Sequence, residues 1–399
     1  MEKKSIKNKV FASALALTLT IGAFQLPAYV SNADGTTAPK LMIKKVLNLP
    51  KDGVSTPNET FTFEFEKHSF NTKEDETSKG KLPKIDNATA KIEKTMNTDM
   101  DTATDGKQIV KLTDDVLKGV NFPEPGQYTY RVKEKKGTTN AMTYSSASYL
   151  ISILTKTEGG KVVVSSIQIK KEKNDDGQEK PEGKTEYKPG AGAEGKDNNF
   201  VFNNNYDPKG GNNNPTGKDI TTEDKKGFVL RKEVAGTNGN VNEKFKFNIT
   251  ANKPDGSHSN EINFKYKVVS SDGTAGAEKT ANYNTPFDVE LKHGDRVVFG
   301  DVLLGTIVKA EETVDFGYQK SIKDDSKING QKVTDVESLK NGLAIGDNAG
   351  GNFVNFVNTQ QTATGILMNN LPFIALVLAA GFGIFFFVKN KKEDENTQA

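Results

Sequence analysis

The sequence predicts an all-β fold with two tandem immunoglobulin-like β-sandwich domains, flanked by an N-terminal signal peptide and a C-terminal transmembrane helix. Apolar and polar residues alternate with period two along many short segments, which is typical of strands that bury one face. Gly, Pro, Asn and Asp separate these segments, and no convincing amphipathic helix competes with them. The same order of segments recurs in the second half, so we expect two versions of one module.

Each expected strand is predicted from the same alternation of apolar and polar residues. In chain order, the strands are expected at 41–47, 61–65, 128–132, 149–151 and 162–164, and then at 228–234, 245–249, 308–312 and 354–358. Between the two halves, residues 207–219 contain a pair of glycines, three consecutive asparagines and a proline. Such a segment cannot bury a core, so the sequence predicts an interdomain linker there.

Both ends of the chain carry apolar segments that are typical of targeting. Residues 1–33 begin with four lysines, continue as an apolar run and end in small residues, which predicts a secretory signal peptide cleaved after Ala33. Residues 366–388 are apolar and long enough to span a bilayer. Basic residues follow directly, so residues 389–399 are expected as a cytoplasmic tail.

Composition argues against several classes of function. The chain has no cysteine, so an exported protein of this length needs another source of robustness than disulfides. Its 54 Lys and Arg nearly balance 52 Asp and Glu, with both signs interspersed, so no nucleic acid partner is expected. His68, His258 and His293 have no ligand-like neighbours, so we expect neither a metal nor a cofactor. Without a nucleophile-elbow or phosphate-loop motif, we do not expect an enzyme acting on outside substrates.

Each half places one lysine, one glutamate and one asparagine in phase with apolar neighbours. The lysine lies on the first strand, the glutamate on a middle strand and the asparagine on the last strand, and period-two geometry aims all three into the core. The residues are Lys45, Glu134 and Asn204 in the first half, and Lys232, Glu312 and Asn358 in the second.

The register of two of these positions has a neighbouring alternative. Lys44 precedes Lys45, and Glu311 precedes Glu312. Phase with the apolar residues around them favours Lys45 and Glu312.

Three buried polar groups in one sandwich predict a covalent bond, because isolated burial of each costs several kcal/mol. Desolvation makes a lysine amine neutral and nucleophilic, and it keeps a glutamic acid protonated. The protonated Glu would polarise the asparagine carbonyl by a hydrogen bond, the amine would attack, and ammonia would leave. Taken singly, each residue is more often an ordinary surface or edge-strand side chain. The repetition of the whole set in both halves favours the isopeptide crosslink.

The sequence resembles the streptococcal T-antigen or FctA-type major pilins over essentially the whole mature chain. The segments that carry the resemblance are 40–45, 125–134, 202–204, 230–236 and 356–358. This resemblance implies two isopeptide-containing immunoglobulin-like domains. It also implies that the first-strand lysine, the middle glutamate and the last-strand asparagine of each domain form the bond.

A sorting signal is expected directly before the membrane segment. Gln361-Thr362-Ala363-Thr364-Gly365 follows the last expected strand, and a sortase would cleave between Thr364 and Gly365. FctA-type pilins normally have a proline at the position of Ala363. The alternative to a sorting signal is a plain membrane anchor that happens to follow a Thr-Gly pair. The expected parts are a signal peptide (1–33), a first domain (34–206), a linker (207–219), a second domain (220–360), a sorting motif (361–365), a membrane helix (366–388) and a tail (389–399).

Polymerisation also needs a lysine that accepts the next subunit's Thr364 acyl group. The resemblance implies a position just ahead of the last strand of the first domain, where Lys196 stands. Lys188 and Lys184 lie in the same approach and are alternatives. For any one of these lysines, a solvated loop charge is the simpler interpretation.

Together these features predict the backbone subunit of a covalent pilus on the cell wall of a Gram-positive bacterium, supporting adhesion and colonisation. The expected partners are identical subunits, a pilus sortase, minor tip and base pilins, peptidoglycan and host surface ligands. The precursor would be anchored transiently in the membrane. The alternative is a monomeric wall-anchored adhesin of the same fold.

Overall fold

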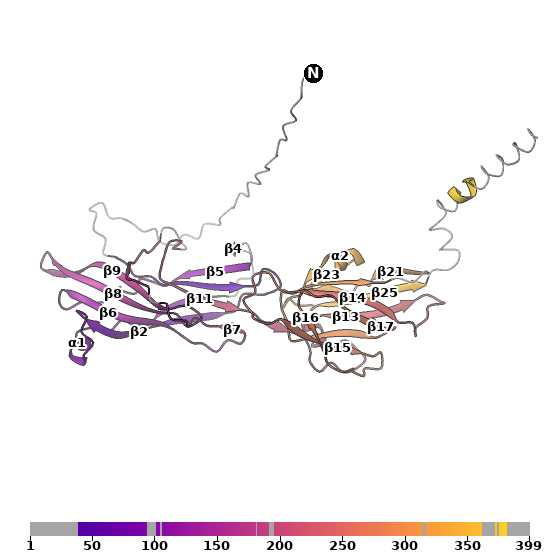
Figure 1. Cartoon of the computed structure of the whole chain (residues 1–399), viewed down its shortest axis with the longest axis horizontal. Coiled ribbons are helices and arrows are strands. Elements are labelled where there is room, and N and C mark those ends of the chain that lie inside the picture. Colours follow the sequence, from indigo (N-terminus) through magenta and orange to yellow (C-terminus); the bar gives the residue numbers. More distant parts are fainter. Residues whose placement is uncertain are drawn as a thin grey trace, which may run out of the picture.

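The structure, a computed structural model, describes residues 39–93, 101–103, 106–180, 182–190, 195–313, 317–360, 372 and 375–380. Over these residues the chain is mostly β and forms two β-sandwich-like bodies, which lie end to end along the long axis (Figure 1). This confirms the part of the predicted fold class that concerns a mostly β chain with two sandwich-like bodies.

The N-terminal body consists of two facing sheets. The first sheet has the strand order β4 (Asp101–Ala103), β5 (Gly106–Leu112), β1 (Lys44–Leu49), β11 (Val201–Tyr206) and β7 (Met142–Thr143). The second has the order β10 (Thr185–Glu186), β9 (Lys161–Lys173), β8 (Ser148–Glu158), β6 (Gly126–Lys135), β2 (Glu59–Phe70) and β3 (Ala88–Ile92).

The C-terminal body repeats this two-layer arrangement. Its larger sheet has the order β16 (Lys279–Asn282), β15 (Asn263–Val269), β18 (Arg296–Gly300), β13 (Val229–Ala235), β25 (Phe353–Gln360), β22 (Lys327–Ile328) and β23 (Gln331–Lys332), with β21 (Tyr318–Ile322) also paired to β25. The smaller sheet has the order β17 (Phe287–Leu291), β14 (Phe245–Asn252), β20 (Ile307–Glu312) and β24 (Leu343–Ala344).

Helical segments are short and lie outside the sheets, and the sequence alternation gave no sign of them. They are α1 (Glu76–Gly80), α2 (Val336–Asn341) and the 3-10 turn η1 (Asp224–Lys226). In α1 and α2 the preceding aspartate caps the helix by accepting a hydrogen bond from a backbone N–H of the first turn. This is the usual way in which an N-terminal N–H finds a partner.

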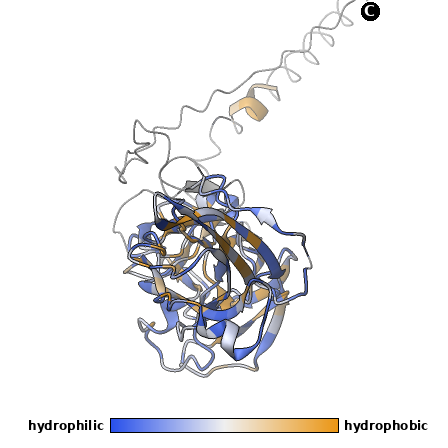
Figure 2. Cartoon of the chain, turned by 90° about the vertical axis from the view of Figure 1, so that its left-hand side faces the viewer, coloured by the Kyte–Doolittle hydropathy of each residue, from blue (hydrophilic) through white to orange (hydrophobic). Residues whose placement is uncertain are grey.

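Burial follows the period of two that the sequence shows. In β14, Phe245, Phe247, Ile249 and Ala251 are buried, and the residues between them are exposed or half-buried. Figure 2 looks along the molecule from the N-terminal body and shows apolar stretches on the strands with hydrophilic segments around them. The two interiors form separate apolar clusters, and a third, smaller cluster of Val229, Val269, Val298 and Phe353 lies in the C-terminal body.

In each body the first and last strands are neighbours and run parallel. β1 pairs with β11 from Lys44 to Asn48, and β13 pairs with β25 from Val229 to Ala235. Strands far apart in sequence therefore lie about 4.8 Å apart in the middle of a sheet. Side chains on their inner faces therefore lie close to one another although they are far apart in the sequence.

The segment expected as a linker, 207–219, continues from β11 along the C-terminal body. Its strand β12 (Lys209–Gly210) pairs with β19 (Val302–Leu303). Next to it, the backbone N–H and the hydroxyl of Ser55 donate to the carboxylate of Asp347 at 3.0 and 2.7 Å. Leu304 packs into the N-terminal core. The two bodies thus share direct contacts beside the connecting chain.

Most of the expected targeting and sorting segments lie outside the described residues. This holds for the signal peptide at 1–33, the motif at 361–365 and the tail at 389–399. Of the expected membrane helix at 366–388, only Pro372 and residues 375–380 are described, and they are helical and exposed. Among the described residues, no helix has both the length and the apolar character needed to cross a membrane.

Candidate crosslinking sites in the two cores

Lys45 lies inside the N-terminal sandwich. Lys45 is 0% exposed, because β1 is a central strand and alternate side chains of that strand face the second sheet. The Nζ atom donates a hydrogen bond to Oε2 of Glu134 at 2.6 Å and lies 4.4 Å from the centre of the Phe61 ring. A lysine amine in such surroundings has one polar partner and otherwise apolar contacts.

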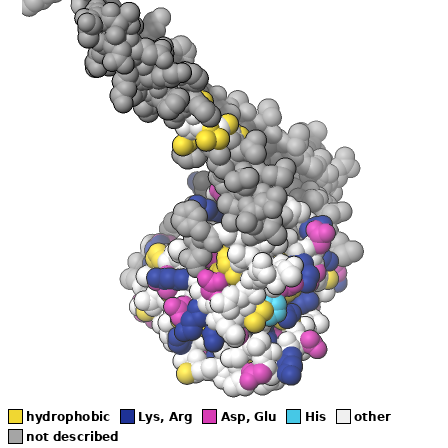
Figure 3. Space-filling view, turned by 90° about the vertical axis from the view of Figure 1, so that its right-hand side faces the viewer, with side chains coloured by type: hydrophobic (Ala, Val, Ile, Leu, Met, Phe, Trp, Pro, Cys, Tyr) yellow, Lys and Arg dark blue, Asp and Glu magenta, His cyan; other side chains and the backbone are white. Residues whose placement is uncertain are grey.

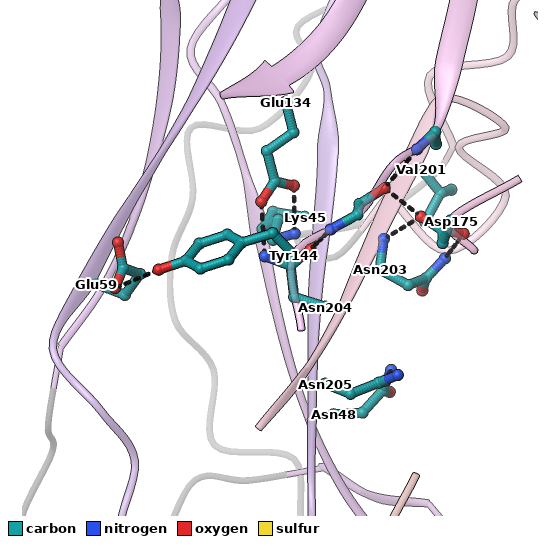
Figure 4. Close-up of polar contacts among 12 residues, drawn as sticks. Lys45, Asn48, Glu59, Glu134, Tyr144, Asp175, Val201, Asn203, Asn204 and Asn205 are labelled. Atoms are coloured by element: carbon teal, nitrogen blue, oxygen red, sulfur yellow. Dashed lines mark hydrogen bonds and ion pairs between the residues drawn. The ribbon is translucent and has the colours of Figure 1, made fainter. Parts of the chain in front are cut away.

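Asn204 meets the same carboxyl group from the neighbouring strand. It is 0% exposed, and its Nδ2 donates to Oε1 of Glu134 at 2.6 Å. Glu134 therefore bridges the lysine amine and the asparagine amide with its two oxygens, as Figure 4 shows. The structure brings together the three residues that the sequence predicted for this body.

The C-terminal body contains the same arrangement. Lys232 is 0% exposed, and its Nζ donates to Oε2 of Glu312 at 2.9 Å. Asn358, also 0% exposed, donates from Nδ2 to Oε1 of Glu312 at 2.6 Å. The amine lies 4.2 Å from the centre of the Phe245 ring.

The two sites are equivalent in strand register as well as in residue type. In both, the lysine lies opposite a phenylalanine two residues before the asparagine, and the glutamate lies opposite a second phenylalanine. Lys45 pairs with Phe202 and Lys232 with Phe356, while Glu134 pairs with Phe63 and Glu312 with Phe247. Two separate β-sandwiches therefore produce one geometry.

Burial sets the protonation of the reacting groups. Desolvation lowers the pKa of Lys45 to about 8, although the nearby Glu134 favours the charged amine. It also raises the pKa of Glu134, against the opposite effect of Lys45. Desolvation likewise lowers the pKa of Lys232 to about 8. Both changes favour a neutral amine beside a carboxylic acid, which is the reactive combination.

The orientation of the Asn204 amide differs from the sequence-based expectation, in which the glutamic acid contacts the carbonyl. The backbone N–H of Ser145 donates to Oδ1 of Asn204 at 2.7 Å. A backbone N–H can only donate, so the atom that faces it must be the amide oxygen. Glu134 consequently contacts the amide nitrogen. Ser145 has no sequence signal, because it lies in a connection whose position depends on tertiary closure.

The N-terminal body also matches a known family. Residues 41–207 match the family model described as FctA, the Spy0128-like isopeptide containing domain. The N-terminal body is an FctA-type domain. Residues 226–360 match a second family model, described as a domain of unknown function (DUF7601). A search of curated proteins gave no match.

Solved structures similar to the whole chain include pilus proteins. The major pilin T3.2 from Streptococcus pyogenes is 19% identical, with 82% of this chain and 98% of that chain covered and a TM-score of 0.33. Another major pilin from Streptococcus pyogenes is 18% identical, with 82% and 100% covered and a TM-score of 0.31. A pilus-presented adhesin, Spy0125 (Cpa), is 14% identical, with 54% and 37% covered and a TM-score of 0.25.

The C-terminal body holds a second Lys–Glu–Asn set that sequence reasoning did not identify. Lys323 and Asn355 both donate to Oε2 of Glu233, at 3.0 and 2.9 Å. The Lys323 side chain is 49% exposed, however, so its amine remains hydrated. Burial alone would raise the pKa of Glu233, but hydrogen bonds from Lys323 and Asn355 hold that pKa below its usual value. The hydrated lysine and the lowered pKa of Glu233 do not supply the desolvated amine and carboxylic acid that attack on an amide requires, so we expect this set to be unreactive.

The two alternatives in register lie outside the cores. Lys44 is half-buried, and its Nζ donates to the backbone carbonyl of Lys196 at 3.4 Å. Glu311 is exposed and forms an ion pair with Lys340 at 2.8 Å. Neither takes part in the buried Lys–Glu–Asn contacts of its domain, whereas Lys45 donates to Glu134 and Glu312 accepts from Asn358.

The residues proposed for polymerisation are placed only in part. Lys196 is exposed in a turn shortly before β11 of the FctA-type domain, and the alternatives Lys188 and Lys184 are exposed as well. Exposure alone does not choose among the three lysines. Thr364 and Gly365 lie outside the described residues.

Proposed function

We propose that this protein is the major structural subunit of a sortase-assembled covalent pilus on a Gram-positive cell surface. In this proposal each immunoglobulin-like domain forms its own Lys–Asn isopeptide bond, Lys45 to Asn204 and Lys232 to Asn358. The observation that carries the proposal is the repeated, fully buried Lys–Glu–Asn geometry. Crosslinks of this kind supply the extracellular robustness that a chain without cysteine lacks.

The bond forms by a single internal substitution at the asparagine amide. The neutral Nζ of Lys45 attacks Cγ of Asn204, and the Cγ–Nδ2 bond breaks. Glu134 contacts both nitrogens, so its carboxyl group takes the surplus proton from the amine and gives its own to Nδ2. One ammonia leaves, and Glu134 ends in its original state. No oxidant, metal or external catalyst enters this balance.

In the proposal, ammonia leaves toward a surface hollow beside the N-terminal site, where the Glu134 side chain itself is 0% exposed. A hollow of about 480 Å³ lies over this end of the core and is lined by Glu134 and by residues 142–147. Departure of the product into this hollow would make the reaction effectively irreversible. Glu134 thus has both the contacts and the position for proton transfer.

Polymerisation would link the Thr364 carbonyl of one subunit to Lys196 of the next. On the face shown in Figure 3, Lys and Arg side chains are interspersed with Asp and Glu. A mixed surface of this kind provides no strong field for charge-driven stacking. In the proposal the sortase, minor pilins and peptidoglycan are the partners, and the cell wall is the location.

Intact mass tests the crosslinks. A recombinant 34–360 protein should be lighter than its sequence by two ammonia molecules. Asn204→Ala and Asn358→Ala should each lose one ammonia fewer than the wild type, so each variant should be one ammonia mass heavier once the mass change of the substitution is subtracted. Asn355→Ala is the matched control and should change nothing beyond the substitution. A wild-type protein at its full calculated mass would refute the crosslinks.

Cell-wall extracts test polymerisation. The native strain should show a ladder of high-mass species that disappears with Lys196→Ala. Lys188→Ala and Lys184→Ala are controls that should leave the ladder unchanged. A single wall-linked species in the native strain would instead support the monomeric adhesin, and loss of the ladder only with Lys188→Ala or Lys184→Ala would reassign the acceptor.

A further inference from the structure

The amide oxygen of Asn204 has a dedicated hydrogen-bond donor. The Ser145 N–H contacts it at 2.7 Å, and the two residues are 6% and 0% exposed. When an amine attacks an amide, negative charge develops on this oxygen. A preorganised donor in a site shielded from water stabilises such charge strongly, because it needs no reorientation during the reaction.

Asp175 fixes the position of this donor. Its Oδ1 accepts from the Ser145 hydroxyl at 2.6 Å and from the backbone N–H of Asn203 at 2.8 Å. The Asp175 carbonyl accepts from the Ser146 N–H at 2.9 Å, and the Ser145 hydroxyl in turn accepts from the Ala147 N–H at 3.1 Å. The connection after β7 is thereby tied to the strand that carries Asn204.

The C-terminal site has no such donor among the described residues. Oδ1 of Asn358 is buried there without a hydrogen-bond partner. The cause lies in the neighbouring strand. β21 pairs with β25 continuously from Tyr318 to Ile322 and passes Asn358 opposite Lys320, so its backbone groups belong to the ladder. β7 pairs with β11 only at Asn205 and Tyr206, and the chain then turns over the Asn204 side chain.

We propose that the Ser145 backbone N–H is an oxyanion donor for the N-terminal crosslink, that Asp175 is its positioning residue, and that the C-terminal crosslink forms more slowly without this donor. The inference rests on the proposed function, since it concerns the rate of the same bond. Loss of one oxyanion donor typically slows a reaction by a factor on the order of 10² to 10³.

A kinetic experiment on the whole 34–360 protein tests this. Cell-free synthesis is stopped at intervals by acid and denaturant, and the crosslinked peptide of each domain is quantified after digestion. The C-terminal bond serves as an internal clock in every sample. In the wild type, the N-terminal bond should form first.

Ser145→Pro removes the N–H and should slow only the N-terminal bond, by a factor on the order of 10². Ser145→Ala keeps the N–H but loses the contact with Asp175, so it should slow the same bond by a smaller factor. Because alanine adds no charge, the pH midpoint of the rate, which Lys45 sets, should stay unchanged in this variant. Protease resistance of the N-terminal domain shows whether each variant has folded.

The outcomes separate the inference from the proposed function. Wild-type N-terminal rates in the folded Ser145 variants would overturn the oxyanion role while the crosslinks stand. An unchanged rate in Ser145→Ala would overturn the positioning role of Asp175, because this variant keeps the N–H and loses only the hydroxyl contact. If Ser145→Pro fails to fold, a wild-type N-terminal bond that forms no faster than the C-terminal bond would overturn the oxyanion role. A wild-type protein that forms neither bond would refute the proposed function itself.

Discussion

Replacing Asn204 by alanine removes the electrophile of the N-terminal site and leaves Lys45 and Glu134 in place. The crosslink closes a loop of roughly 160 residues, which the chain-entropy relation values at about 5 kcal/mol of stability against unfolding. The lost hydrogen bonds of the buried amide add about 1–3 kcal/mol. A domain of this size shifts its Tm by about 2–4 °C per kcal/mol, so the crosslink alone should be worth roughly 10–20 °C.

Scanning calorimetry of the 34–360 protein measures this change, and intact mass confirms that one ammonia fewer has been lost. Asn355→Ala is the matched control, because Asn355 is a buried amide bound to a glutamate in the unreactive set. The Tm change caused by Asn355→Ala reports the stability that is lost with the amide hydrogen bonds alone, where no crosslink is expected. If Asn204→Ala lowers the Tm of its domain no further than Asn355→Ala lowers that of the other, the entropic reasoning is wrong.

Three further outcomes follow from the site geometry. Ammonia loss in the N-terminal domain should accelerate between pH 6 and pH 8. The reason is that a pKa of about 8 for Lys45 implies that the neutral fraction of its amine rises from about 1% to about half over this range. A rate that does not depend on pH would exclude the neutral amine as the nucleophile. Glu312→Ala should abolish the C-terminal bond alone, while Glu311→Ala should leave both bonds intact in peptide maps; bond loss in the second variant would contradict the register. Lys323→Ala should change the intact mass only by the mass of the substitution. An additional gain of one ammonia mass would show that the set of Lys323, Glu233 and Asn355 also forms a crosslink.

Much of the core could be predicted from the sequence because strand periodicity is local. The phase of Lys45 with its apolar neighbours places it on the inner face of β1, and the structure has it there at 0% exposure. The same phase argument separates Glu312, which is buried, from Glu311, which pairs with Lys340 at the surface. Alternation depends only on neighbouring residues, so it survives without knowledge of the tertiary fold.

The remaining parts of the site depend on contacts that no local pattern encodes. The Ser145 N–H reaches Asn204 because β7 ends early and the following connection is tied to Asp175. Lys323, Glu233 and Asn355 repeat the reactive residue types, and only exposure distinguishes them from the buried sets. Side-chain identity therefore indicates where a crosslink is chemically conceivable, whereas desolvation decides where it can form.

The parallel pairing of β13 and β25 has a consequence for a fibre under tension. A pull applied through the two ends of the C-terminal domain travels along β13 to Lys232, and an isopeptide bond there passes it straight to Asn358 and out along β25. Once the proposed bond has formed, the roughly 125 residues between these positions would carry no load and could not be drawn out. Without the bond, forced unravelling of that segment could lengthen each subunit by roughly 400 Å. If the domains are joined into a shaft as proposed, that shaft would resist stretching through a short covalent path rather than through the hydrogen bonds of its sheets.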